Sequence, residues 1–109
     1  MNYYELEVGS NTYKLRLNTR GIVALEKKLG CNPLAIFGSG ETIPTVTTMV
    51  NILHAALQAL QHKITLEDAY DIWDNWLNDG HNMVEFIPVI LEVYRYSGLI
   101  GKEEAEEKN

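Results

Sequence analysis

The spacing of apolar residues along the first thirty positions changes from two to about 3.6. Apolar and acidic residues alternate over residues 3–8, and apolar and basic residues alternate over residues 12–17. Alternation of this kind is typical of a strand with one buried face, and Gly9-Ser10-Asn11 supplies a turn between the two runs. The pattern predicts a β-hairpin whose exposed face sets an acidic strand beside a basic one.

Helical spacing begins at Asn18-Thr19 and continues until Gly30, a residue that commonly ends helices. Residues 31–37 then form an apolar stretch that predicts a short helical turn with Pro33 at its first position. Residues 38–41 (GSGE) are expected to form a mobile loop.

Two further helices are predicted over residues 44–61 and 66–78. Pro44 suits the first position of a helix, and Thr65 with Asp68 forms a capping box at the start of the next helix. The apolar stripe of the first consists of Val46, Met49, Val50, Leu53, Leu57 and Leu60. The apolar face of the second consists of Ala69, Tyr70, Trp73, Trp76 and Leu77.

The last predicted helix, residues 83–97, begins after Asn82 and is apolar around nearly its whole circumference. Pro88 lies within it and is expected to kink it. A helix of this kind must be covered on all sides, so it is either the central helix of the domain or an interface helix that another chain completes. We predict that this helix contributes to self-association or to partner binding through Phe86, Ile90, Tyr94 and Tyr96.

Together these elements predict one α+β domain over residues 1–100: an N-terminal β-hairpin followed by a bundle of about four helices. Residues 101–109 form a charged C-terminal tail with nothing to bury, which is expected to be flexible and disordered. A chain of 109 residues with 46% hydrophobic residues is long enough to bury a core.

The composition of the chain argues against several classes of function. The formal net charge of −6 and the scattered basic residues argue against a nucleic-acid partner. The single cysteine, Cys31, excludes an internal disulfide and fits a reducing compartment. No apolar run is long enough to span a bilayer and the N-terminus does not resemble a signal peptide, so we expect a cytoplasmic protein with no membrane partner.

Candidate chemistry is sparse. Asp68, Asp71 and Asp74 recur every third residue and could suggest a cation site, but a row on one helix side is more often a solvated face. His54, His62 and His81 lie on three different segments without metal-ligand spacing. We therefore predict no catalytic residue, no cofactor site and no metal site, and we expect that the protein is not an enzyme.

Two smaller features each have two interpretations. Cys31 could be imagined as a nucleophile, but a lone cysteine after a helix-ending glycine is more often a small buried hydrophobe. Trp73 and Trp76 lie on one helix face with Tyr70, where core packing is the default and a partner-binding patch is the alternative.

The order of the elements and several short motifs resemble the tail assembly chaperones of long-tailed (siphovirus-type) phages and prophages of Gram-positive bacteria. The similarity covers nearly all of residues 4–100. The motifs that carry it are structural rather than catalytic: TYKLRL at 12–17, LEKKLG at 25–30, NPL at 32–34, ITLEDAYDI at 64–72 and SGL at 97–99.

The resemblance implies a non-enzymatic phage morphogenesis protein that acts in the host bacterial cytoplasm. Such a protein binds the tape measure protein, recruits tail tube subunits and is absent from the finished virion; a homo-oligomer is possible. The alternative is a small phage structural or connector protein of the neck or tail that is incorporated in the virion. A small hydrolase or metal-binding enzyme is disfavoured by the scattered His and Asp residues.

Overall fold

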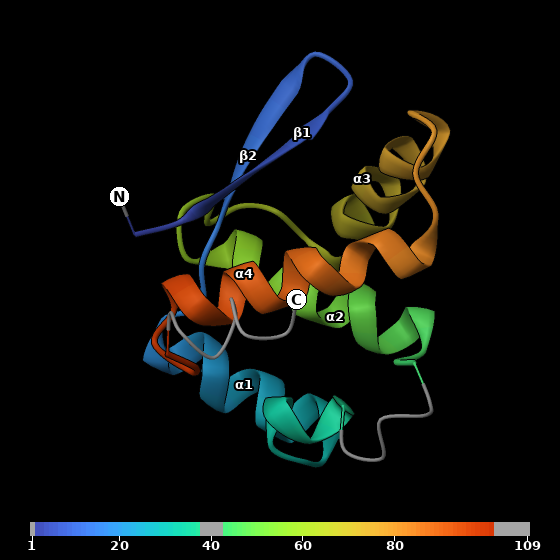
Figure 1. Cartoon of the computed structure of the whole chain (residues 1–109). Helices are drawn as coiled ribbons and strands as arrows, with labels where there is room; N and C mark the ends of the chain where they lie inside the picture. Colours follow the sequence, from blue (N-terminus) through green and yellow to red (C-terminus); the bar gives the residue numbers. More distant parts are fainter. Residues whose placement is uncertain (1, 38–42, 102–109) are drawn as a thin grey trace.

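The computed structural model of the chain describes residues 2–37 and 43–101. Within these residues a two-stranded hairpin is followed by four α-helices and two 3₁₀ segments, which confirms the predicted α+β fold (Figure 1). The elements are β1 (Tyr4–Val8), β2 (Asn11–Leu15), α1 (Thr19–Leu29), η1 (Pro33–Phe37), α2 (Val46–Gln58), α3 (Leu66–Asn78), η2 (Met83–Glu85) and α4 (Phe86–Tyr96). The predicted loop at 38–41 and the predicted tail from residue 102 onward lie outside the described residues.

The hairpin has the register that its alternation predicts. β1 and β2 pair antiparallel, with Glu5 opposite Lys14, so one acidic residue does face a basic one. Glu7 instead faces Thr12, because the turn contains only Gly9 and Ser10. Gly9 has a φ of 60°, which suits the first central position of a tight two-residue hairpin turn.

The second strand is shorter than predicted and ends at Leu15. The backbone of the next two residues leaves the hairpin for other partners. Arg16 N–H donates to the carbonyl of Ala56 in α2 at 3.1 Å, and Leu17 N–H donates to Ser97 Oγ beyond α4 at 2.8 Å. These bonds fasten the end of the hairpin to both helices, and the Leu17 side chain is buried.

The helix starts follow local capping signals. Asn18 caps α1 by accepting a hydrogen bond from Gly21 N–H at 2.8 Å, and the predicted Thr65 capping box is present at the start of α3. The prediction for α2 was too long at both ends. Pro44 is buried before the helix, Thr45 is its cap, and the helix ends at Gln58.

The last α-helix begins later than predicted. Asn82 and Glu85 form a capping box, but it opens the 3₁₀ segment η2, and the α-helix begins only at Phe86. Pro88 is therefore in the first turn of α4. The N–H groups of a first turn have no partner within the helix, so the missing N–H of proline breaks no helical hydrogen bond there.

The core forms around α2, which buries six side chains and packs against α1, α3, α4 and β2. Helix α4 packs against α2 and β1. Five of its side chains are buried: Phe86, Val89, Ile90, Val93 and Tyr94. These five recur at helical spacing, so α4 turns one face to the core, and α2 rather than α4 has the central position; a second chain on the rest of α4 stays a prediction.

None of the helices in the described part of the chain is both long enough and apolar enough to cross a membrane.

Candidate functional site

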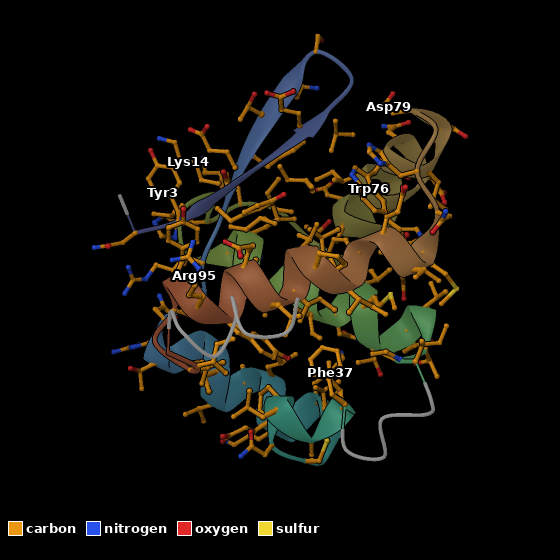
Figure 2. The ribbon with its side chains drawn as sticks, in the orientation of Figure 1. Tyr3, Lys14, Phe37, Trp76, Asp79 and Arg95 are labelled. Atoms are coloured by element: carbon orange, nitrogen blue, oxygen red, sulfur yellow. The ribbon has the colours of Figure 1, made fainter. Side chains whose placement is uncertain are left out.

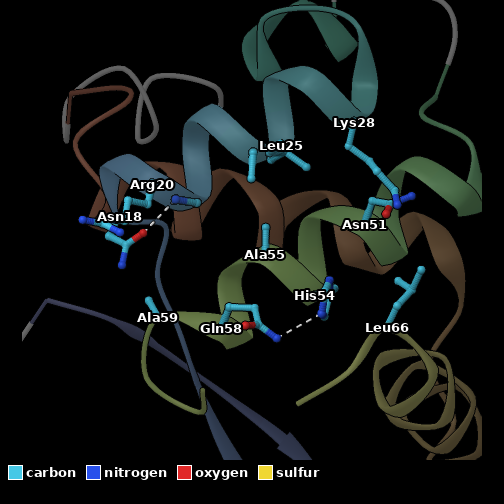
Figure 3. Close-up of a pocket in the computed structure, with 12 residues that line it drawn as sticks. Asn18, Arg20, Leu25, Lys28, Asn51, His54, Ala55, Gln58, Ala59 and Leu66 are labelled. Carbon is cyan, nitrogen blue, oxygen red and sulfur yellow. Dashed lines mark hydrogen bonds between the residues drawn. The ribbon is translucent and has the colours of Figure 1, made fainter. Parts of the chain in front are cut away.

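An open groove with a volume of about 460 Å³ lies between α1 and α2, beside the first residue of α3 (Figure 3). We call it the α1–α2 groove. Its size falls in the range of about 300–1,000 Å³ that is usual for ligand sites. Its lining residues are Asn18, Arg20, Gly21, Ala24, Leu25, Lys28, Asn51, His54, Ala55, Gln58, Ala59 and Leu66.

The groove exists because small residues face each other on the two helices. Gly21 and Ala24 come from α1, and Ala55 from α2, with Ala59 at the end of α2. A Cβ atom at Gly21 would lie 3.2 Å from Asn18 Oδ1 and 3.7 Å from the carbonyl oxygen of Ala55. The distance to Ala55 is ordinary van der Waals contact, so the backbones of α1 and α2 lie close together at this end, and the tight contact is with the α1 cap Asn18. The small side chains leave the surface beyond it unfilled.

The rim of the groove is basic and polar. Arg20 and Lys28 both line it from α1, and none of the twelve lining residues is acidic. In a chain with 15 acidic and 9 basic residues this is an uneven distribution. Within the described residues neither Arg20 nor Lys28 forms an ion pair, so both charges are available to a partner.

The polar side chains of α2 in the groove are held by internal hydrogen bonds. The amide nitrogen of Gln58 lies 3.0 Å from His54 Nε2 and also donates to the carbonyl of Ile64 (Figure 3). Asn51 Nδ2 donates to the carbonyl of Thr47 at 2.8 Å. These contacts fix one wall of the groove before any ligand arrives, which reduces the entropy lost on binding.

The lining combines small apolar residues with amide, imidazole and cationic side chains. The twelve lining residues include no Ser, Thr, Cys, Tyr, Asp or Glu side chain to serve as a nucleophile or carboxylate base. What the groove offers is apolar contact along its floor and two cations at its rim.

The residues that we predicted for partner binding are mostly inside the domain. Phe86 is 1% exposed, and Ile90 and Tyr94 are 0% exposed, so a partner could not reach them in this structure. Only Tyr96 is partly exposed, and the guanidinium of Arg95 lies 4.3 Å from the centre of its ring. The structure does not bring the four residues together on one surface.

Tyr94 has a structural role instead. Its hydroxyl donates a buried hydrogen bond of 3.0 Å to the carbonyl of Pro33, and Phe37 packs edge-on against its ring at 6.4 Å. Burial, and secondarily the nearby Cys31, raise the pKa of the Tyr94 phenol well above its usual value. The phenol is therefore neutral and connects α4 to η1.

The structure also shows where Cys31 and the row of aspartates lie. Cys31 is exposed, so its interpretation as a buried hydrophobe is wrong; it follows the left-handed Gly30 at the end of α1, outside the core. Asp68, Asp71 and Asp74 are all exposed, which agrees with a solvated face. In the part of the chain that the structure describes, no three His, Cys, Asp or Glu side chains lie close enough together to hold a metal ion.

The two tryptophans are part of the core. This agrees with core packing, the default of their two interpretations. Trp73 and Trp76 are buried, and each meets the ring of Phe86 edge-on, at 5.1 Å and 5.5 Å. His81 stacks on Trp76 at 4.4 Å and contacts Glu85 Oε1 at 3.1 Å (Figure 2 labels Trp76). Tyr70, predicted on the same face, is exposed.

Our sequence reasoning did not find the α1–α2 groove. A signal was present, because Ala55 and Ala59 are four residues apart and Gly21 and Ala24 are three apart, so each pair lies on one helix face. Small residues at helical spacing on two helices predict a close approach or a furrow between them.

The fold and the groove define a small α+β domain with an interhelical groove. The chain belongs to a family of unknown function, DUF6096, whose family model matches residues 4–109. The searches of curated proteins and of solved structures found no match.

Proposed function

We propose that this protein is a non-enzymatic phage tail assembly chaperone that binds the tape measure protein and recruits tail tube subunits in the host bacterial cytoplasm. The observation that carries the binding part of this proposal is the α1–α2 groove, with its apolar floor and its rim of Arg20 and Lys28. The choice of the tape measure protein and tail tube subunits as partners rests on the resemblance of residues 4–100 to tail assembly chaperones.

A helix is the client element that suits this groove. Helices dock into grooves between other helices through one apolar face, and small residues on the groove floor let the two backbones approach. Because Arg20 and Lys28 come from the same wall, acidic residues on the edge of the incoming helix would face them. The predicted ligand is therefore an amphipathic helical segment of the tape measure protein with an acidic edge.

Co-expression with a tape measure protein tests the proposal. Ala24→Trp should abolish co-purification, because the indole fills the groove from an exposed position at little cost to the fold. Ala35→Trp is the matched control, since Ala35 is an exposed alanine of η1 that does not line the groove. Equal co-purification of both variants, or none by the unmodified protein, would contradict the proposal.

Purified particles separate this role from that of a connector protein. A chaperone should be absent from finished virions although abundant in the infected cell. Quantitative mass spectrometry that finds the protein in virions at the stoichiometry of a neck or tail ring would favour the connector alternative.

A further inference from the structure

The two edges of the hairpin differ in their hydrogen bonding. Along the outer edge of β2, Lys14 N–H donates to Gln61 Oε1 at 2.9 Å, and Gln61 Nε2 donates to the Lys14 carbonyl at 2.9 Å. The next outward N–H, that of Arg16, is bonded to Ala56 of α2. Helix α2 and its C-terminal turn therefore close this edge of the sheet.

The outer edge of β1 is open, and the register identifies its unpaired groups. In an antiparallel pair, a residue that turns its N–H and C=O outward lies opposite another that does the same. Lys14 points outward, so its partner Glu5 also points outward, and so does Glu7, two residues further along β1. Within the described residues, no hydrogen bond joins the backbone of Glu5 or Glu7 to α3, η2 or α4.

A groove of about 600 Å³ lies along this open edge. Four consecutive residues of β1, Tyr4 to Glu7, form one wall, and their side chains alternate between the two faces of the sheet, so the groove follows the strand edge itself. The opposite wall consists of Trp76, His81, Glu85, Pro88 and Val89. One end is near the hydrogen bond of 2.6 Å from Gly9 N–H to Asp79 Oδ2, which fastens the hairpin tip to the end of α3 (Figure 2 labels Asp79).

The charge around this groove is opposite to that of the α1–α2 groove. Glu5, Glu7 and Glu85 line it, there is no Lys or Arg among its nine lining residues, and its one histidine contacts Glu85. The other lining side chains are largely apolar, with Leu6, Trp76 and Val89 at the base.

We propose that the open edge of β1 binds an extended segment of a partner protein in which basic and apolar residues alternate. The segment adds a third strand to the sheet by hydrogen bonding to the backbone of Glu5 and Glu7. Its basic side chains lie on the exposed face beside the two carboxylates, and its apolar side chains point towards Leu6 and Val89. This surface is separate from the α1–α2 groove, so it goes beyond the helix-binding function proposed above.

A second copy of this chain is a poorer occupant. If two β1 strands paired antiparallel about Leu6, Glu5 of one copy would lie opposite Glu7 of the other, and like charges directly opposite destabilise a sheet. The alternating basic strand β2 of another copy has the right composition, but its outer edge is already occupied by Gln61 and Ala56. Charge complementarity therefore points to a different, basic polypeptide.

The test is a titration of the ¹⁵N-labelled protein with the capped hexapeptide Lys-Val-Lys-Val-Lys-Val. The amide signals of Glu5 and Glu7 should shift most, and the signals of the α1–α2 groove should not move. The same peptide with every backbone nitrogen methylated should lose all binding, because no N–H group remains to donate to β1. A Glu-Val-Glu-Val-Glu-Val peptide should not bind.

The variant Glu5→Gln/Glu7→Gln should bind the basic peptide about tenfold more weakly, because it loses two cross-strand charge pairs but keeps the shape of both side chains. Asp71→Asn/Asp74→Asn removes the same charge from the exposed face of α3 and should bind as the unmodified protein does. Dispersed amide spectra establish that each variant is folded. The proposal is overturned if the β1 amides do not respond, if the methylated peptide binds equally well, or if the two double variants bind alike.

Discussion

Helices α1 and α4 are each 11 residues long, yet they have opposite relations to the rest of the domain. Helix α4 buries five side chains, and α1 buries only Leu25. The difference follows from their neighbours: α4 packs against α2 and β1, whereas α1 packs against α2 and η1 (Figure 1). Apolar residues around most of a helix therefore indicated an element of the core, and the proposed binding groove is beside the α-helix with the fewest buried residues.

Truncating a side chain should destabilise the protein much more in α4 than in α1. Ile90→Ala removes a fully buried side chain from α4 and leaves a cavity, so it should lower the free energy of unfolding by about 3 kcal/mol. Val23→Ala, the control in α1, truncates a side chain that is 44% exposed and should change the free energy of unfolding by less than about 0.5 kcal/mol. Urea denaturation followed by tryptophan fluorescence measures both. Similar losses from the two truncations would mean that α4 contributes no more to the core than α1 does.

A second comparison concerns the buried hydrogen bond from the Tyr94 hydroxyl of α4 to the Pro33 carbonyl of η1. Tyr94→Phe leaves the Pro33 carbonyl without this donor and should cost about 1–2 kcal/mol of unfolding free energy. Tyr13→Phe serves as the control, because Tyr13 is only partly buried and no hydrogen bond of its hydroxyl occurs in the described structure. Equal stability of the Tyr94→Phe variant and the unmodified protein would remove the structural role assigned to this hydroxyl.

The Tyr94 phenol should also make the folded protein less stable at alkaline pH. Burial raises the pKa of Tyr94 in the folded state above its ordinary value of 10.0, so the neutral phenol favours folding. Its contribution is fully present below pH 10, the pKa of an unfolded tyrosine, and it is lost as the pH rises above that value towards the folded pKa. Between about pH 10 and 12 the unmodified protein should therefore lose stability more steeply than Tyr94→Phe, measured by urea denaturation at each pH. Parallel profiles would show that this phenol does not titrate differently on folding.

The elements could be predicted because their signals are local. Asn18, Thr65 and Asn82 each cap a helix or helical segment through an atom three residues away, and the alternation of the hairpin sets its own register. Tertiary contacts decided the rest. Whether Ile90 faces the core or a partner depends on what covers α4, and the exposure of Cys31 depends on where the chain leaves α1. The α1–α2 groove could be inferred only by pairing two helices whose contact no local pattern specifies.

At the rim of the α1–α2 groove, a small effect on stability should accompany a large effect on binding. Arg20→Glu/Lys28→Glu changes two exposed side chains and should lower the free energy of unfolding by no more than about 1 kcal/mol, mostly through the lost interaction of Lys28 with the end of the α1 dipole. Capture of the acidic-edged helical client should nevertheless fall at least about tenfold, because two attractive contacts become repulsive.

Lys27→Glu/Lys63→Glu is the matched control for this rim variant. It makes the same change in net charge, and Lys27 lies in the same last turn of α1, but neither residue lines the groove. Binding by isothermal titration at low and high salt separates a local contact from an effect of overall charge, since long-range attraction is screened at high salt. If the control loses as much affinity as the rim variant, net charge rather than the groove governs the interaction. If only the rim variant loses affinity, the α1 wall of the groove carries the recognition.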